Sequence, residues 1–213
     1  MMLSAGVAIL SPTNMADMEL PHEPTAESLD AVLMARAGNG DHNAFRQLVE
    51  RHQHAVVGTV AKMLGDPAEA EDIAQQVFLR LWRHAKRYRP EAKFTTYLFT
   101  ITRNLVFNES RRRGRRKEVS VEEREDSANF HLPAPTEREP DSTLLQGELQ
   151  AAVDKAIQSL PEAQRVAVIL RRYEQMPYEE IAKVLDLTVP AIKSLLFRAR
   201  TTLREALRDY LDD

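Results

Sequence analysis

The stretch that decides the fold is residues 178–203, whose sequence is YEEIAKVLDLTVPAIKSLLFRARTTL. Apolar residues recur at helical spacing on both sides of Asp186, Leu187 and Thr188, which favour a tight turn. The pattern predicts a short helix at residues 178–185 and a final long helix from Val189 to about Leu211. A short helix, a tight turn and a longer helix form a candidate helix-turn-helix, whose second helix enters the major groove of DNA.

The final helix has one apolar and one polar face, as an ordinary amphipathic helix also has. Polar-face residues near its N-terminus are placed to reach base edges, and the later arginines are placed to meet phosphates. The predicted DNA-facing residues are Pro190, Ala191, Lys193, Ser194, Phe197, Arg198, Thr201 and Arg204. Leu195 falls at the edge of the opposite, apolar arc, so we expect it to pack against the core.

Residues 29–113 have helical periodicity throughout, with clear breaks between four helices. Gly65 ends the second helix, and Asp66 opens the third as an N-cap with Pro67 at the first helical position. Glu69 completes the pattern of a capping box. The same capping logic is predicted where Ser159 precedes another helix.

The chain has 213 residues, 43% of them apolar, which is enough for two small domains with packed cores. No segment shows the alternation of a strand, so the predicted fold is all-α. Residues 118–143 combine eight acids with three prolines and predict a flexible acidic linker. The predicted divisions are a disordered N-terminal extension at residues 1–25, a helical domain at 26–117, the linker at 118–143 and a helix-turn-helix domain at 144–213.

The net charge of −3 is the sum of positively and negatively charged segments. Residues 26–117 carry +7 and the linker carries −6, and residues 103–117 and 188–208 are two separate basic stretches. Two basic patches on helices are typical of phosphate binding, although solvated helix ends give the same pattern. The segregation also suggests that the acidic linker screens or occupies the basic faces in the free protein.

One face of the third helix is a candidate protein-docking surface. Leu79 falls in the middle of its polar arc, where intramolecular burial is least expected, and an apolar residue ringed by polar ones is a small docking patch. A singly exposed leucine is the alternative. The predicted docking residues are Glu71, Asp72, Gln75, Gln76, Leu79 and Arg83.

The fourth helix, from about Thr95, turns a mixed face of guanidinium, amide, hydroxyl and aromatic groups away from its apolar arc. Arginine holds phosphates, an asparagine amide reads a base edge, and aromatic rings stack unpaired bases. A plain polar helix face is the alternative. The predicted nucleic-acid residues are Thr96, Thr100, Arg103, Asn104, Phe107, Arg111 and Arg112.

Other chemistries find little support. His52 and His54 lie two apart on a helix and face different directions, so they do not chelate one metal ion. The chain has no Cys, no phosphate-cradling glycine loop and no partnered acid–base pair in the acidic Glu179–Glu180 stretch. We therefore expect no enzyme activity, no metal and no cofactor. The apolar run before Ser11 is too short for a membrane span and lacks a preceding basic residue, so we expect a cytoplasmic protein.

Four segments of the chain, in the same order as in a known protein family, resemble that family's motifs. Residues 66–82 (DPAEAEDIAQQVFLRLW), 94–113 (FTTYLFTITRNLVFNESRRR), 159–172 (SLPEAQRVAVILRR) and 178–203 together resemble the extracytoplasmic-function (ECF) sigma factors of bacterial RNA polymerase. The resemblance implies docking of the third helix on the clamp helices of the largest polymerase subunit. It also implies melting and recognition of the −10 element by residues 94–113, −35 recognition by the last helix, and a cognate anti-sigma factor.

Two alternatives stay open at this point. One is a self-sufficient helix-turn-helix regulator that binds its operator without polymerase, and the other is a polymerase-binding adaptor or decoy. The Leu79 face and the Arg103/Asn104 face distinguish a sigma factor from a self-sufficient regulator, because a plain regulator needs neither face. Gln76 stands where the family usually has an acid, which weakens a charge-based contact with polymerase. Leu195 stands where the family usually has an arginine, so the resemblance implies no −35 sequence preference.

Overall fold

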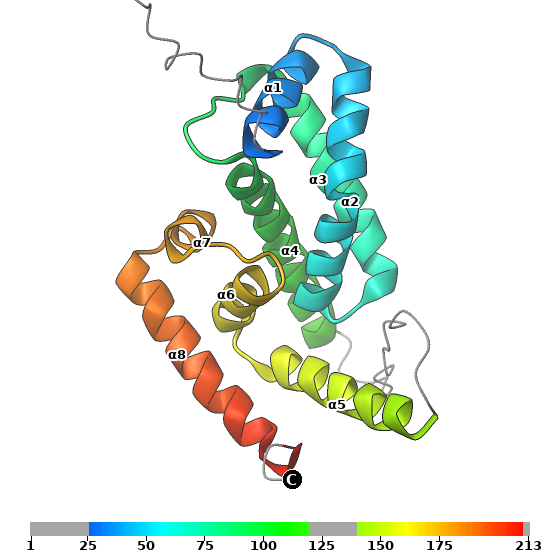
Figure 1. The fold of residues 1–213 in the computed structure, drawn as a ribbon, viewed down its shortest axis with the longest axis vertical. Helices are drawn as coiled ribbons and strands as arrows, with labels where there is room; N and C mark the ends of the chain where they lie inside the picture. The colour runs from blue at the N-terminus through cyan, green and yellow to red at the C-terminus, as the bar shows by residue number, and fades with distance from the viewer. Residues whose placement is uncertain (1–25, 120–139, 211–213) are drawn as a thin grey trace, which may run out of the picture.

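The regular elements of residues 26–119 and 140–210, the part of the chain that the structure describes, are all helical, as the sequence predicted. The structure is a computed structural model, shown in Figure 1. The N-terminal residues 1–25 and residues 120–139 of the predicted linker lie outside the described residues, as does the proposed screening role of that linker. The helices are α1 (Ala26–Gly38), α2 (His42–Leu64), α3 (Pro67–His84), η1 (Ala85–Arg87), α4 (Phe94–Val119), α5 (Pro140–Ser159), α6 (Glu162–Arg172), α7 (Tyr178–Leu185), α8 (Val189–Ala206) and η2 (Arg208–Tyr210).

Helices α1 to α4 form a bundle because each turns an apolar stripe inward. The predicted arc of α3 is confirmed: its apolar side is buried while its polar side faces solvent. Trp82 packs at the end of α3, with its ring centroid 4.9 Å from those of both His42 and Phe45 on α2. The buried α3 residues are Ala70, Ile73, Ala74, Val77, Phe78 and Leu81.

Local sequence signals set the ends of α2 and α3. Asp41 caps α2 by accepting a hydrogen bond from the Ala44 N–H at 3.0 Å, and Gly65 ends that helix at φ 69°, which glycine adopts without steric cost. Asp66 caps α3 by accepting from the Ala68 N–H at 3.0 Å. The predicted end of α2 at Gly65 and the predicted N-cap of α3 at Asp66 are therefore confirmed.

The helix-turn-helix has the predicted form. Helix α7 ends at Asp186, which adopts the left-handed conformation at φ 56°, and the Leu187 N–H returns to the Ala182 carbonyl at 2.9 Å. Thr188 then caps α8, since its side chain accepts from the Ala191 N–H. Ile192 on α8 is fully buried, as are Ile169 and Leu170 on α6 and Ile181 on α7, which fixes the angle between the two helices of the motif.

Three sequence-based boundaries were wrong. Ser159 does not cap α6: it is the last residue of α5, and its hydroxyl donates back to the Ala156 carbonyl at 2.7 Å, as serines at helix ends often do. Helix α5 begins at Pro140 rather than near Leu144, because a proline is tolerated in a first helical turn. Helix α8 ends at Ala206, where a 3-10 turn takes over, rather than near Leu211.

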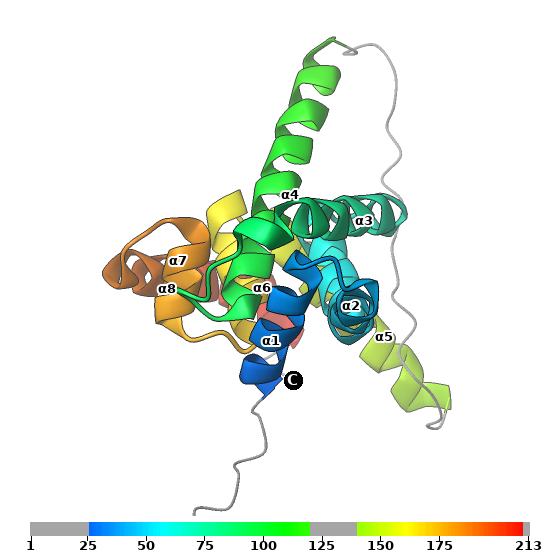
Figure 2. The ribbon, with the colours of Figure 1, turned by 90° about the horizontal axis from the view of Figure 1, so that it is seen from above.

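The two groups of helices pack against each other, an arrangement that the sequence left open. Helix α7 packs on α4 and helix α6 packs on α2, and buried residues of both groups form one continuous apolar core. Figure 2 shows the C-terminal end of α4 projecting beyond the rest of the described fold. The N-terminal half of α4 therefore has α7 as a neighbour, while its C-terminal end stands clear.

Candidate functional site

The predicted docking face of α3 is exposed along its whole length. Leu79 has 54% of its surface accessible, although its helical neighbours Phe78 and Leu81 are buried. The other five predicted residues, Glu71, Asp72, Gln75, Gln76 and Arg83, are exposed around it. The side chains thus form an apolar point within a polar surface, the arrangement expected of a specific docking patch.

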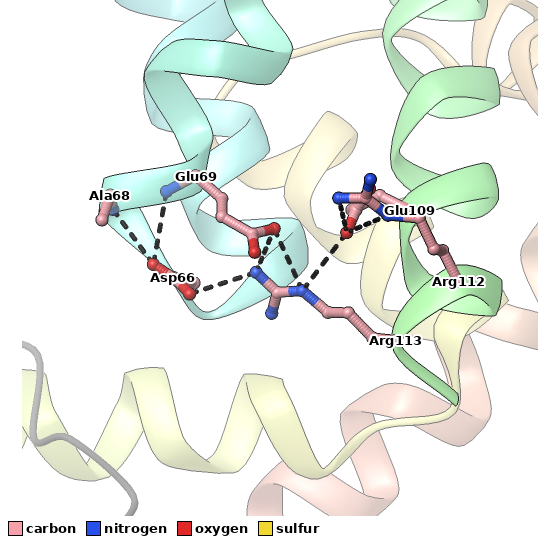
Figure 3. A network of polar contacts seen from close by, with 6 residues as sticks. All are labelled: Asp66, Ala68, Glu69, Glu109, Arg112 and Arg113. Atoms are coloured by element: carbon pink, nitrogen blue, oxygen red, sulfur yellow. Dashed lines mark hydrogen bonds and ion pairs between the residues drawn. The ribbon is translucent and has the colours of Figure 1, made fainter. Parts of the chain in front are cut away.

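An ionic cluster joins the start of α3 to the C-terminal part of α4 (Figure 3). The Arg113 guanidinium lies 3.1 Å from the Asp66 carboxylate and donates from Nε to Glu69 Oε2 at 3.1 Å. Arg112 donates two hydrogen bonds to Glu109 Oε1, at 3.1 and 2.8 Å. Glu109 is buried, and the two arginines supply the hydrogen bonds and ion pairs that a buried carboxylate needs. The cluster fixes the docking helix against the helix predicted to bind −10 DNA.

This cluster corrects two expectations from the sequence. The Glu69 carboxylate contacts Arg113, so the capping box is realised only in its Asp66 half. The run of basic residues at the end of α4 is also less positive than its composition indicates, because Arg112 and Arg113 face three carboxylates. Arg111 and Arg115 remain exposed.

The predicted nucleic-acid face of α4 is only partly open. Asn104, Arg111 and Arg112 are exposed, and Thr100 and Phe107 are half-buried. Thr96, by contrast, has 3% of its surface accessible, because α7 covers the N-terminal half of α4. The structure therefore separates a covered part of this face from an accessible part nearer the C-terminus of α4.

Arg103 is already engaged within the chain. Its Nε and Nη2 atoms donate to the Val184 carbonyl at 2.9 and 2.6 Å, and its guanidinium carbon lies 5.3 Å from the centroid of the Phe107 ring. Val184 is in the last turn of α7, where carbonyls lack intrahelical partners and cations are favoured. In this structure Arg103, which the sequence predicts to hold a phosphate, caps the C-terminal end of the helix packed on α4.

Glu180 and Lys93 are functional candidates that the sequence reasoning missed. Glu180 has 8% of its surface accessible, with Oε1 3.0 Å from Lys93 Nζ and Oε2 3.3 Å from the Thr96 hydroxyl, which donates to it. Glu180 lies one helical turn before the buried Val184, so both fall on the same face of α7. This spacing was the one signal in the sequence that Glu180 would be buried. Its partners are 84 or more residues away in sequence, beyond the reach of pattern reasoning.

The predicted −35 face of α8 is open. Ala191 is half-buried, and the remaining residues of the set are exposed: Pro190, Lys193, Ser194, Phe197, Arg198, Thr201 and Arg204. Phe197 is the most exposed large apolar side chain among the described residues, at 70%. Leu195 packs against the core, as expected from its position on the helix. Figure 1 shows α8 along the outer edge of the described fold.

His52 has a packing role rather than a chelating one. Its Nε2 lies 2.8 Å from the Asp30 carboxylate and its ring packs against Phe94, whereas His54 is exposed. Burial opposes ionisation of Asp30, but hydrogen bonds and charges from His52 and Arg51 outweigh burial and hold the pKa of that carboxyl below its ordinary value. Within residues 26–119 and 140–210 no group of His, Cys, Asp and Glu side chains is arranged to hold a metal ion.

The geometry defines a helical protein with an exposed leucine on the polar face of α3, exposed arginines near the C-terminus of α4 and a helix-turn-helix. Comparison with known families divides the chain in two: residues 48–116 match the Sigma-70 region 2 family, and residues 150–203 match the Sigma-70, region 4 family. The chain is 35% identical over 185 residues to the RNA polymerase sigma-H factor of Pseudomonas aeruginosa, covering 85% of this chain and 95% of that protein. It is 33% identical over 176 residues to the ECF RNA polymerase sigma-E factor of Escherichia coli K12, covering 82% and 92%.

Solved structures agree with these matches. The sigma factor RpoE in complex with the anti-sigma factor NepR, from Bartonella quintana, superposes with a TM-score of 0.65 at 26% identity, covering 77% of this chain and 96% of that one. CnrH in complex with the cytosolic domain of CnrY has the same fold, with a TM-score of 0.61 at 23% identity, covering 86% and 99%.

The chain therefore belongs to the ECF group of the sigma-70 family, the sigma factors of bacterial RNA polymerase. The match to region 2 removes the main support for a self-sufficient helix-turn-helix regulator, since that class needs only the C-terminal part. Among the described helices none is long and apolar enough to cross a bilayer.

Proposed function

We propose that this chain is an alternative sigma factor that binds core RNA polymerase through α3 and reads promoter DNA through α4 and α8. In this role it is a transcription initiation factor that works in the cytoplasm and performs no catalysis itself. The relatives' names support polymerase as the partner. The anti-sigma complex of the Bartonella relative supports an inhibitory partner of the same kind for this chain.

The observation that carries the proposal is the exposed Leu79 within the polar face of α3. An isolated apolar side chain gains free energy only when a partner buries it, about 1.5–3 kcal/mol for a leucine. The surrounding carboxylates and amides supply hydrogen bonds that fix the register of the partner helix. We propose the clamp helices of the largest polymerase subunit as that partner.

The proposed −10 contacts lie on α4. Extruding a base costs a few kcal/mol of stacking, which an aromatic stack and amide hydrogen bonds offset. Phe107 and Asn104 supply these two chemistries one turn apart, and the exposed arginines beyond them meet phosphates. This set is proposed to hold the unpaired −10 strand.

The proposed −35 contacts lie on α8. Its N-terminal residues from Pro190 to Ser194 would face base edges in the major groove, and Arg198 and Arg204 would face phosphates. The exposed Phe197 ring would lie between these two groups against an apolar part of the groove, such as a thymine methyl.

Multi-round transcription with core polymerase on a promoter library tests the function. Leu79→Asp is expected to abolish core binding with helicity unchanged, because it places a carboxylate where a partner must bury a leucine. Val32→Asp is the matched control, since Val32 on α1 is equally exposed at 54%. The sigma-factor proposal would be refuted if no promoter-specific transcripts form and the chain binds duplex DNA tightly in the absence of core polymerase.

A second arm of the same experiment tests α4. Asn104→Ala should impair binding to −10 DNA more than binding to −35 DNA, because its amide faces only the unpaired strand. Asn43→Ala, on the exposed start of α2, serves as control. Equal loss at both elements in the Asn104 variant would contradict the assignment.

A further inference from the structure

Glu109 is a buried acid in the basic C-terminal part of α4, the helix proposed to bind −10 DNA. It has 7% of its surface accessible, and Figure 3 shows its carboxylate between the side chains of Arg112 and Arg113. A carboxylate in such a segment repels DNA phosphates and is costly to bury, so it weakens DNA binding unless its contacts offset both effects. The two arginine contacts of Glu109 therefore decide its role.

Arg113 is committed to α3 rather than to DNA. Its guanidinium lies 3.1 Å from the Asp66 carboxylate and donates to Glu69 at 3.1 Å, whereas its Nε is 3.9 Å from Glu109. Its side chain has 29% of its surface accessible. Asp66 and Glu69 thus hold Arg113, and Glu109 is the closer partner of the other arginine.

Arg112 is held on one edge of its guanidinium while half of its side chain is accessible. It donates from Nε and Nη2 to Glu109 Oε1 at 3.1 and 2.8 Å, and 52% of the side-chain surface is exposed. A guanidinium has a second pair of donors at its tip, formed by the two terminal nitrogens, and this pair matches two phosphate oxygens. A carboxylate on the Nε edge leaves the second pair in place, so Arg112 is able to bind Glu109 and a phosphate together.

We propose that Glu109 is a positioning residue for promoter DNA: it holds the Arg112 guanidinium ready for a phosphate of the unpaired −10 strand. Ordering a long side chain on binding opposes association, and an arginine that is already held avoids most of this cost. This inference rests on the proposed function and names the residue that prepares one of its contacts. It also sets a sign, because removal of a negative charge next to DNA is expected to weaken binding instead of strengthening it.

Binding of a −10 strand by the holoenzyme, core polymerase with this chain bound, tests the sign. The probe is a labelled single-stranded oligonucleotide that carries the −10 element of a promoter selected from the library. Glu109→Gln should weaken its binding roughly two- to tenfold, since an amide gives Arg112 a weaker hydrogen bond than a carboxylate does. Glu109→Met, which removes both oxygens, should weaken it at least as much. Glu50→Gln removes the same charge from the exposed face of α2 and should leave the affinity unchanged.

A double-substitution cycle separates positioning from general damage. Arg112→Ala should weaken binding and lower the slope of log affinity against log salt concentration by about 0.7, the value for one phosphate contact on a single strand. In the Arg112→Ala background, Glu109→Gln should cause no further loss, because no Arg112 guanidinium is left for it to hold. In an Arg111→Ala background, Glu109→Gln should keep its full effect, since Arg111 lies on the exposed side of the helix.

Circular dichroism and core affinity check that every variant keeps its fold and its docking face. Tighter or unchanged −10 binding in Glu109→Gln, or an equal further loss in the Arg112→Ala background, would overturn the positioning role alone. Absence of −10 binding by the unchanged holoenzyme would instead overturn the proposed function, and this inference with it.

Discussion

Asp30 shows how one buried carboxylate is kept charged inside the α1–α4 bundle. It has 3% of its surface accessible, with Arg51 Nε at 2.8 Å from one oxygen and His52 Nε2 at 2.8 Å from the other. Three residues from α1 and α2 thus form a compact unit beneath Phe94, the first residue of α4. The unit positions the start of α4, and so bears on the −10 face, without touching DNA.

Asp30→Asn is expected to destabilise the fold by about 3 kcal/mol at neutral pH, because it removes one partner of a buried charged cluster. The lowered pKa of Asp30 means that its contribution is present above its ordinary value of 3.8 and is lost as pH falls through the folded value. Urea unfolding of both chains at several pH values measures this. Their stabilities should converge in acid, and a gap independent of pH would contradict the interpretation. Glu50→Gln on the exposed face of α2 is the control.

At the scale of elements, the Arg113 cluster couples α3 to α4. Arg113→Gln should lower the free energy of unfolding by about 1 kcal/mol, since part of the cluster is exposed, and lower the Tm by about 2–4 °C. The effect should shrink in high salt, which screens the exposed pairs with Asp66 and Glu69. Arg115→Gln removes the same charge from the exposed side of α4 and should leave the Tm unchanged. Equal shifts in both variants would show that net charge, not the cluster, matters.

The elements themselves were largely predictable from sequence. The arc of α3, the caps at Asp41 and Asp66, and the span of α7 depend on residues within a few turns, where periodicity and capping act. The burial of Thr96 and Glu180 was not predictable, because each depends on a partner 84 residues away. The predicted N-cap at Ser159 was wrong for a local reason, because its hydroxyl donates to a carbonyl of α5 rather than capping α6.

At the scale of the whole molecule, the two domains are joined by polar contacts on two sides. Besides α7 on α4, the Thr59 hydroxyl of α2 donates to Glu174, which follows α6, at 2.7 Å, and the Lys62 Nζ lies 4.6 Å from the centroid of the Tyr173 ring. The Gln158 side chain, on α5, donates to the Lys62 carbonyl. The packing of the two domains therefore rests on polar contacts as well as on the shared apolar core, and groups at this interface contribute to the stability of the folded chain.

Glu174 makes the stability of the packed fold depend on pH. Burial raises the pKa of its carboxyl above the ordinary value of 4.5, although the Thr59 hydrogen bond and the charges of Lys62 and His52 oppose the shift. The folded chain thus binds a proton more readily than the unfolded chain, so its stability rises as pH falls through the raised pKa towards 4.5. Glu174→Gln keeps an acceptor for Thr59 and removes the buried charge. It should stabilise the fold at pH 8 by about 1 kcal/mol or less, and its free energy of unfolding in urea should change less with pH than that of the unchanged chain. Parallel pH curves for the two chains would mean that another group sets the pH dependence of stability.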